Sequence, residues 1–217
     1  MTGASLLAWL ASLPPDERDR ALDERLGIGP PAPCDAPPGE HLVGYHASGV
    51  APVVRALLEI PVISDDVLVD LGSGLGKVVL LASLLTGATA RGIELQEPLV
   101  HRARDAARRL GVAASFTVGD AREAPVGDGT VFYLYAPFTG PVLAAVLERL
   151  QAVARERAIV VCALGIELPR VAWLVPRAVD SFWLSIHDSH VPGVAPRRTP
   201  AARPQLPFAE VVAADTR

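Results

Sequence analysis

The sequence has few cysteines, no long apolar run and no excess of positive charge. Its two cysteines, Cys34 and Cys162, lie far apart and lack the spacing of a zinc site or a redox motif, so neither a metal centre nor a disulfide framework is expected. No apolar stretch approaches the roughly 18 residues of a membrane-spanning helix. The formal net charge of −4 argues against a nucleic-acid partner. These absences predict a soluble protein of the reducing cytoplasm.

A chain of 217 residues is long enough for one substantial domain with small appendages. Residues 1–40 are expected to form a small helical cap, with helices over 4–13 and 15–26, followed by a proline-rich linker. Residues 41–191 are expected to form the main domain. Residues 192–217, which contain many prolines and arginines, are expected to form a surface tail.

Short apolar segments alternate with helical patterns throughout the main domain. The expected strands span 67–70, 89–95, 115–118, 130–135, 158–164, 172–179 and 182–187, and the expected helices span 77–85, 97–110, 139–153 and a segment that Ser48 caps and Pro61 ends. Such alternation indicates a doubly wound, mostly parallel sheet of the Rossmann-like α/β class, with helices on both faces. The closely spaced last two segments predict an antiparallel finish to a seven-stranded sheet.

The turn after the first expected strand is rich in glycine and reads Asp70-Leu71-Gly72-Ser73-Gly74-Leu75-Gly76. Glycine lets a ligand approach the backbone closely, and the N-terminus of the next helix then points at that ligand. A Walker loop would need a glycine at Leu71 and a hydroxyl group at Val78. A dinucleotide fingerprint would need a glycine at Lys77. The spacing therefore disfavours both nucleoside triphosphates and nicotinamide or flavin dinucleotides.

Glu94 stands at the end of the second expected strand, next to this turn. A carboxylate can accept hydrogen bonds from both hydroxyl groups of a ribose, so Glu94 is expected to hold the sugar of a cofactor. Lys77 is unusual in the first turn of a helix, because a cation opposes the helix dipole there. Its ammonium group is expected to face solvent or a cofactor carboxylate.

The pattern Gly-x-Gly-x-Gly with an acid before it resembles the first motif of class I S-adenosylmethionine-dependent methyltransferases. The resemblance covers roughly residues 67–164. More narrowly, segments 69–76, 78–80 and 92–94 are similar to the cofactor core of Dot1-type and small seven-strand protein-lysine methyltransferases. The resemblance implies S-adenosylmethionine as the cofactor. It implies that the cofactor is bound by Asp70, Gly72, Ser73, Gly74, Gly76, Glu94, Asp120 and Ala121, the last two beside the adenine.

The end of the fourth strand faces the reactive methyl group in this family, and here it reads Tyr135-Ala136-Pro137-Phe138. It lacks the polar first residue of the Asn/Asp-Pro-Pro-Tyr/Phe motif found in enzymes that methylate nucleobase amino groups, which argues against that acceptor. The resemblance implies that Tyr135 orients the acceptor and Phe138 forms a wall. It also implies that a loop carrying Tyr45 and His46 folds over the cofactor. Tyr135, Tyr45 and His46 are therefore the candidate catalytic residues, and no metal is required.

The leading hypothesis for the acceptor is a nitrogen atom, specifically a protein lysine side chain, which loses its proton more easily when desolvated. The alternatives are a small-molecule N- or O-methyltransferase of secondary metabolism, a non-catalytic protein that binds S-adenosylmethionine, and an NAD-dependent oxidoreductase. The arginines between Arg102 and Arg109 are expected to form an ordinary solvated helix face. His187, Asp188 and His190 are expected to be structural.

Overall fold

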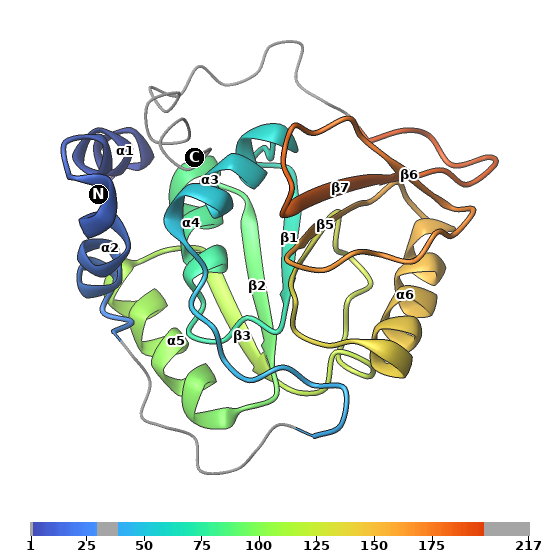
Figure 1. Cartoon of the computed structure of the whole chain (residues 1–217), viewed down its shortest axis with the longest axis horizontal. Coiled ribbons are helices and arrows are strands. Elements are labelled where there is room, and N and C mark those ends of the chain that lie inside the picture. The colour runs from blue at the N-terminus through green and yellow to red at the C-terminus, as the bar shows by residue number, and fades with distance from the viewer. Residues whose placement is uncertain (1, 30–38, 198–217) are drawn as a thin grey trace.

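The computed structural model describes residues 2–29 and 39–197, which contain a seven-stranded sheet in the order β3-β2-β1-β4-β5-β7-β6 (Figure 1). Its strands are β1 (Val67–Leu71), β2 (Thr89–Glu94), β3 (Ala114–Val118), β4 (Val131–Tyr135), β5 (Val160–Leu164), β6 (Leu174–Pro176) and β7 (Leu184–Ser189). Strands β1 to β5 are parallel, whereas β7 runs antiparallel to both β5 and β6. The Rossmann-like fold with an antiparallel finish is therefore confirmed. Cys34, most of the linker and the tail from residue 198 lie outside the described residues.

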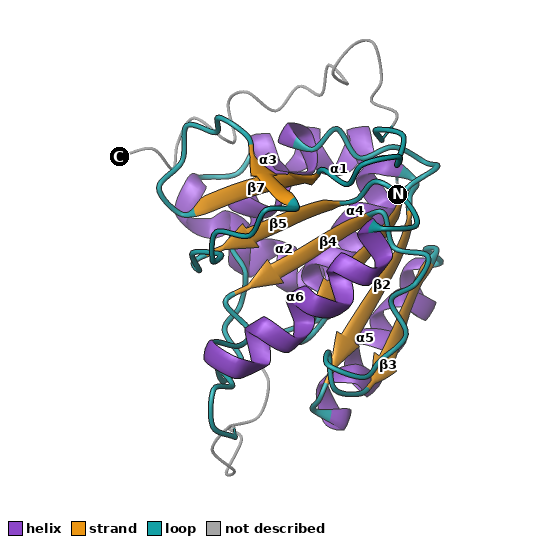
Figure 2. Cartoon of the chain, turned by 90° about the vertical axis from the view of Figure 1, so that its right-hand side faces the viewer, coloured by secondary structure: helices purple, strands orange, loops and turns teal. Residues whose placement is uncertain are grey.

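Helices cover both faces of the sheet (Figures 1 and 2). One face carries α3 (Val50–Glu59), α4 (Lys77–Thr86) and α5 (Glu97–Leu110), and the opposite face carries α6 (Gly140–Ala154). Side chains alternate along each strand, so Tyr133 joins the core of the first face and Phe132 joins the core of the second. In the part of the chain that the structure describes, no helix is long and apolar enough to cross a membrane.

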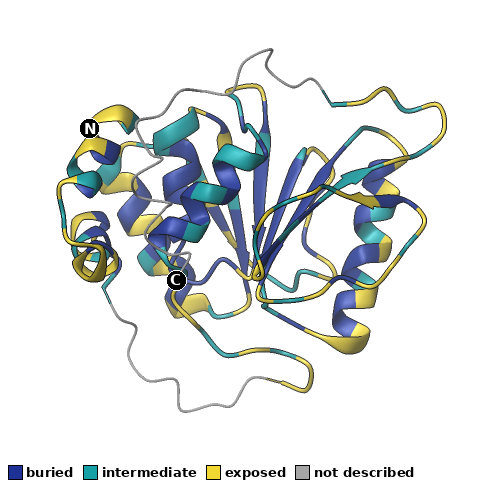
Figure 3. Ribbon diagram, turned by 45° about the horizontal axis from the view of Figure 1, so that its top comes forward, coloured by how far each residue is buried: buried dark blue, intermediate teal, exposed yellow. Residues whose placement is uncertain are grey.

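The N-terminal cap packs on the first face and shares its core. It consists of α1 (Gly3–Ala11), a short 3-10 turn η1 (Pro15–Glu17) and α2 (Arg18–Leu26). Figure 3 shows both cap helices with a buried inner side and an exposed outer side. Leu6, Leu7 and Leu10 are fully buried against the main domain. Burying such apolar side chains contributes about 1.5–3 kcal/mol each, which fixes the cap in place.

The N-terminal helical cap also supplies a hydrogen-bond acceptor for the first backbone N–H group of α3. Ser48 was expected to cap this helix, but this is wrong, because Gly49 occupies the N-cap position and no side chain of its own segment bonds there. Instead, the carboxylate of Asp19, on α2, accepts a 2.7 Å hydrogen bond from the backbone N–H of Val50. A residue 31 positions away in the sequence thus supplies the cap.

The arginines of α5 are largely engaged within the protein. Arg102 and Arg109 donate hydrogen bonds to the carbonyl oxygens of Gly29 and Gly27, just beyond α2. Arg104 donates to a carbonyl oxygen of β3, and Arg108 pairs with Asp105 on its own helix. Arg102 and Arg109 therefore link the cap to the main domain, whereas Arg104, Arg108 and Arg109 are exposed, as expected for a solvated helix face.

The last two strands are shifted from their expected positions. β6 covers only three residues, and β7 begins two residues later than the pattern indicated. The guanidinium of Arg177, which follows β6, donates two 2.6 Å hydrogen bonds to the carboxylate of Asp188 on β7. Asp188 is thus engaged in a structural ion pair. In the first part of the tail, Arg197 forms a buried ion pair with Asp66, next to β1.

Candidate functional site

The carboxyl ends of β1 and β2 meet at the glycine turn. The backbone N–H groups of Gly72 and Ser73 both donate to the carbonyl oxygen of Ile93, at 2.8 and 3.0 Å. Gly72 and Gly74 have φ angles of 88° and 53°, which favour glycine. A Cβ atom at Gly74 would lie 2.6 Å from the ring of Tyr45, so that ring rests directly on the turn. The backbone of the turn is therefore covered on one side by the aromatic ring of Tyr45.

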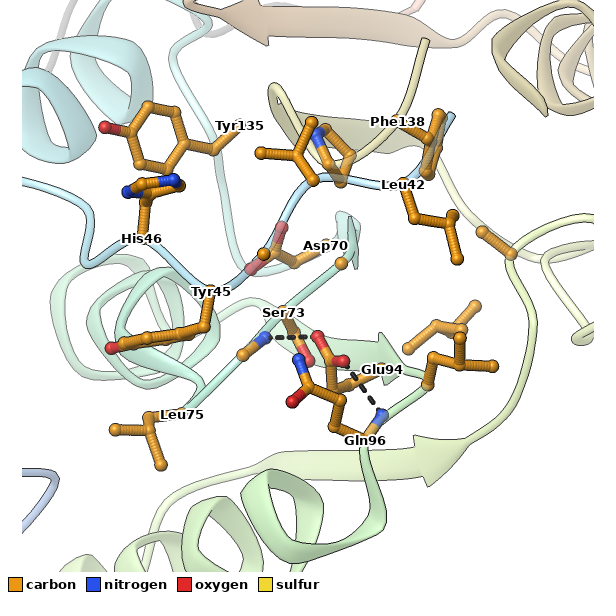
Figure 4. Close-up of a pocket in the computed structure, with 18 of the residues that line it drawn as sticks. Leu42, Tyr45, His46, Asp70, Ser73, Leu75, Glu94, Gln96, Tyr135 and Phe138 are labelled. Atoms are coloured by element: carbon orange, nitrogen blue, oxygen red, sulfur yellow. Dashed lines mark hydrogen bonds between the residues drawn. The ribbon is translucent and has the colours of Figure 1, made fainter. Parts of the chain in front are cut away.

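Glu94 connects the turn to the end of β2 (Figure 4). Its side chain is buried, and its two carboxylate oxygens accept hydrogen bonds of 2.9 Å from the backbone N–H groups of Gly74 and Gln96. Each carboxylate oxygen has two lone pairs, so both retain capacity for a further donor. Glu94 can therefore brace the turn and still accept hydrogen bonds from a ligand.

Asp70 ends up buried beside Glu94 without a partner. Its side chain is 2% exposed, and among the described residues it has neither a hydrogen bond nor an ion pair. Burial, followed by the negative charge of Glu94, raises the pKa of Asp70 well above its ordinary value. A positively charged ligand group placed next to Asp70 would offset this desolvation.

A cavity of about 400 Å³ opens over the turn, which is within the usual range for a small-molecule site. Its lining includes, among the residues predicted to bind cofactor, Asp70, Gly72, Ser73, Gly74, Glu94, Asp120 and Ala121. Gly76 does not line the cavity. A Cβ atom there would lie 2.5 Å from the ring of Phe116, so glycine at this position permits close packing between α4 and the sheet. The fold thus brings seven of the eight predicted residues to one cavity.

Asp120 is already engaged by its own loop. Its carboxylate accepts three hydrogen bonds of 2.6 to 3.0 Å from the guanidinium of Arg122 and a fourth from the backbone N–H of the same residue. These bonds with Arg122 lower the pKa of Asp120 below its ordinary value. Asp120 is therefore an ionised acceptor held in a fixed orientation at the rim of the cavity.

Several lining residues were not identified from the sequence. Leu95, which follows Glu94 and is 52% exposed, presents an apolar surface to the cavity, and Leu42 and Val142 add others. Phe138, which was predicted as a wall, lines the same cavity and is buried. In the sequence, the leucine directly after the predicted ribose-binding acid is the feature that points to this surface.

Lys77, the only lysine in the chain, points to the cap. Its ammonium group lies 2.7 Å from a carboxylate oxygen of Asp23 and 3.5 Å from one of Asp19, and it donates a 2.6 Å hydrogen bond to the carbonyl oxygen of Ser48. The side chain is 5% exposed. The expectation that it faces solvent is therefore wrong, and its charge links α2, α4 and the loop before α3. Lys77 also lines the cavity over the turn, so its contact with a cofactor carboxylate stays a prediction.

Comparison with known proteins agrees with this arrangement. Residues 68–157 match a family model described as a methyltransferase domain. An RNA methyltransferase from Salinibacter ruber, solved with S-adenosyl-L-homocysteine, is 28% identical over 73% of this chain and 99% of its own, with a TM-score of 0.53. A SAM-dependent methyltransferase from Aquifex aeolicus is 16% identical over 63% of this chain and 88% of its own, with a TM-score of 0.50. No curated protein sequence shows significant similarity.

The matched region runs from β1 through α6 and contains the glycine turn and Glu94. The chain is a class I S-adenosylmethionine-dependent methyltransferase. Its cofactor is S-adenosylmethionine. The narrower similarity to Dot1-type enzymes stays a prediction.

The three candidate catalytic residues of the methyltransferase lie together. Tyr135 ends β4, and Tyr45 and His46 lie in the loop before α3. Figure 4 shows His46 between Tyr135 and Tyr45 along one side of the cavity. Burial, followed by the negative charge of Asp23, raises the pKa of Tyr45 to about 12, so this phenol stays neutral. Backbone pairing of Leu42 with Phe138 holds the loop in this position.

A second cavity of about 490 Å³ adjoins the first in the methyltransferase, and Val43, His46 and Tyr135 line both. The other lining residues come from four segments and are Ala51, Pro52, Arg55, Ala136, Leu164, Gly165, Ser181, Trp183 and Leu184. Most of these side chains are apolar, and no carboxylate is among these lining residues. In the part of the chain described here, no cluster of acidic, histidine or cysteine side chains could hold a metal ion.

Proposed function

We propose that the methyltransferase binds S-adenosylmethionine in the 400 Å³ cavity, with the ribose on Glu94 and the adenine near Asp120 and Ala121. The buried, unpartnered carboxyl group of Asp70 supports this placement, because the cofactor carries positively charged groups. The turn lines the same cavity at Gly72, Ser73 and Gly74, which supports it further. When bound, the cofactor supplies a methyl group on a positively charged sulfur atom.

We propose that the acceptor is a small molecule held in the 490 Å³ cavity. The observation that carries this proposal is the lining of that cavity, which combines apolar walls with the guanidinium of Arg55 and includes no carboxylate. A cation in the wall repels the ammonium form of a lysine side chain and leaves it no partner. The protein-lysine hypothesis stays an untested prediction, and the small-molecule alternative is the one that the cavity favours.

His46 is the residue proposed to accept the proton of the acceptor. A neutral imidazole has one ring nitrogen that can accept a proton, and His46 lies on the wall that both cavities share. The hydroxyl group of Tyr135, beside it in Figure 4, can hydrogen-bond the attacking oxygen or nitrogen and orient its lone pair. The ring of Tyr45 and the loop that carries it exclude water from the turn.

An RNA acceptor is the second candidate, because the relative from Salinibacter ruber is an RNA methyltransferase and is matched over 99% of its length. Two observations weigh against it. The net charge is −4, and the arginines of α5 bond to backbone carbonyls or to Asp105. Part of their hydrogen-bonding capacity is therefore used within the protein, and Asp105 offsets one of the charges, which weakens the case for a phosphate-binding surface.

The test measures S-adenosylhomocysteine release from the purified protein with three kinds of acceptor: hydroxylated or aminated aromatic compounds, lysine-containing peptides and short RNA. Turnover with the small compounds supports the proposal, and turnover with only the peptides or the RNA contradicts it. Self-methylation at lysine should add no background, because Lys77 is buried and ion-paired. The variant His46→Gln should lower kcat far more than it lowers the affinity for S-adenosylhomocysteine.

A further inference from the structure

The cavity proposed to hold the acceptor has one permanently charged group in its lining, the guanidinium of Arg55 on α3. This side chain is half-buried and donates a hydrogen bond to the backbone carbonyl oxygen of Asp180. A guanidinium has five N–H donors, so this neutral carbonyl uses only part of its capacity. Charge and donors therefore remain for a ligand.

Arg55 differs from the other arginines near the last strands. Arg177 meets the carboxylate of Asp188 with two hydrogen bonds, and Arg197 meets that of Asp66 in the same way. Within residues 2–29 and 39–197, Arg55 forms no ion pair. A guanidinium in a largely apolar wall is best compensated by an anion that it can bind with two parallel hydrogen bonds.

A large aromatic surface lies in the same wall. Trp183 lines the cavity although it is 66% exposed, and its neighbour Phe182 is 89% exposed. The two rings meet edge to face with centroids 4.8 Å apart. The bond from Arg55 to the carbonyl of Asp180 ties this loop to α3. Exposed aromatic side chains at the mouth of a cavity are suited to stack on a planar ligand.

We propose that the acceptor is a planar aromatic molecule that carries an anionic group. Its ring lies against Trp183, its carboxylate or equivalent anion binds Arg55, and its hydroxyl or amino group faces His46 and Tyr135. This inference rests on the proposed function and adds the chemical class of the substrate. Arg55 and Trp183 are specificity-determining residues, because they select the acceptor and take no part in the reaction itself.

The experiment uses three fluorescent probes of one shape that differ in charge: 6-hydroxy-2-naphthoate, its methyl ester, and 6-hydroxy-2-naphthylmethylamine. Binding to the full chain with S-adenosylhomocysteine present is measured for wild type, Arg55→Gln, Arg55→Lys and Trp183→Ala. Arg91→Gln is the matched control, because it also removes one positive charge and Arg91 lines neither cavity. The melting temperature and the affinity for S-adenosylhomocysteine are recorded for every variant.

The wild type should bind the acid about tenfold or more tightly than the ester, and the ester more tightly than the amine, since a hydrogen-bonded charge pair contributes this much. Arg55→Gln should remove the advantage of the acid, so that acid and ester bind with about equal affinity, Arg55→Lys should restore part of this advantage, and Trp183→Ala should weaken all three probes. Arg91→Gln should behave as wild type.

Equal or weaker binding of the acid in the wild type, failure of all three probes to bind, or an acid preference that survives Arg55→Gln overturns the inference. RNA methylation that is insensitive to both substitutions overturns it as well. Failure of the proposed function looks different, because S-adenosylhomocysteine would then not bind, or no small acceptor of any charge would be methylated.

Discussion

Replacing Glu94 with glutamine should weaken both the glycine turn and the affinity for S-adenosylhomocysteine. The carboxylate accepts two backbone hydrogen bonds of 2.9 Å, from Gly74 and Gln96, in a buried setting. Hydrogen bonds to a charged group contribute about 1.5–3 kcal/mol each, whereas a neutral bond contributes about 0.5–1.5 kcal/mol. Glutamine keeps one neutral acceptor and turns an NH2 group toward the other N–H, so about 2–5 kcal/mol of local stabilisation is lost.

One effect opposes this loss. The charge of Glu94 contributes to the raised pKa of Asp70, so a neutral side chain at position 94 makes the ionised form of Asp70 less costly. The expected net decrease in the free energy of unfolding is therefore at the lower end, about 2–3 kcal/mol. If Glu94 also binds the ribose, the affinity for S-adenosylhomocysteine falls by roughly a further 1.5–3 kcal/mol.

Two measurements separate these contributions. Urea denaturation of the ligand-free protein gives the effect on the turn, and calorimetric titration with S-adenosylhomocysteine gives the effect on binding. The surface substitution Glu97→Gln, three residues away, is the control for a simple change of charge. Wild-type affinity in Glu94→Gln would refute the ribose role, and unchanged stability would refute the hydrogen-bond argument.

Three further predictions concern the cavity and the cap. The affinity for S-adenosylmethionine should increase as the pH rises above 3.8, the ordinary pKa of an aspartate side chain. Burial raises the pKa of Asp70 in the free protein, and a bound cation lowers it again. Calorimetry should show a weaker trend with S-adenosylhomocysteine, which lacks the sulfonium charge, and no trend with Asp70→Asn. The same substitution should stabilise the ligand-free protein at neutral pH, because a raised folded-state pKa means that stability falls as the acid ionises. Lys77→Met should lower the free energy of unfolding in urea denaturation by about 1–3 kcal/mol, because it leaves the half-buried Asp23 without its cation. If Lys77→Met with Asp23→Leu is no more stable than the single variant, the ion-pair argument fails. Gly74→Ala should lower both the melting temperature and the cofactor affinity, because its Cβ would lie 2.6 Å from the ring of Tyr45. Adding Tyr45→Ala to this variant should partly restore stability. An unchanged melting temperature in Gly74→Ala would contradict the contact.

Much of the site could be predicted because it depends on local patterns. Parallel strands align their carboxyl ends, so Asp70 and Glu94, each near the end of its strand, had to approach one another once the alternation of strands and helices was recognised. Tyr135 follows from the same rule at the end of β4. The antiparallel finish was also recognisable, although the bounds of β6 and β7 were not.

Contacts between distant segments could not be predicted in this way. The cap on α3 comes from Asp19, the partner of Lys77 is Asp23, and the ring above the turn belongs to Tyr45, and no periodicity links any of these pairs. Each contact depends on how a separate helix or loop docks on the finished sheet. The preference of serine for helix N-caps therefore predicted Ser48 at this position, although Gly49 occupies it.

The sequence by itself determined the alternation of elements, the glycine turn and the acids at the ends of β1 and β2, because hydrophobic period, glycine spacing and strand ends are local properties. Only the tertiary structure decided what lies above that turn. The second cavity combines Arg55 of α3, Tyr135 of β4 and Trp183 of the loop before β7. These residues meet only because burial of the apolar faces brings their segments together, so the nature of the acceptor depends on packing.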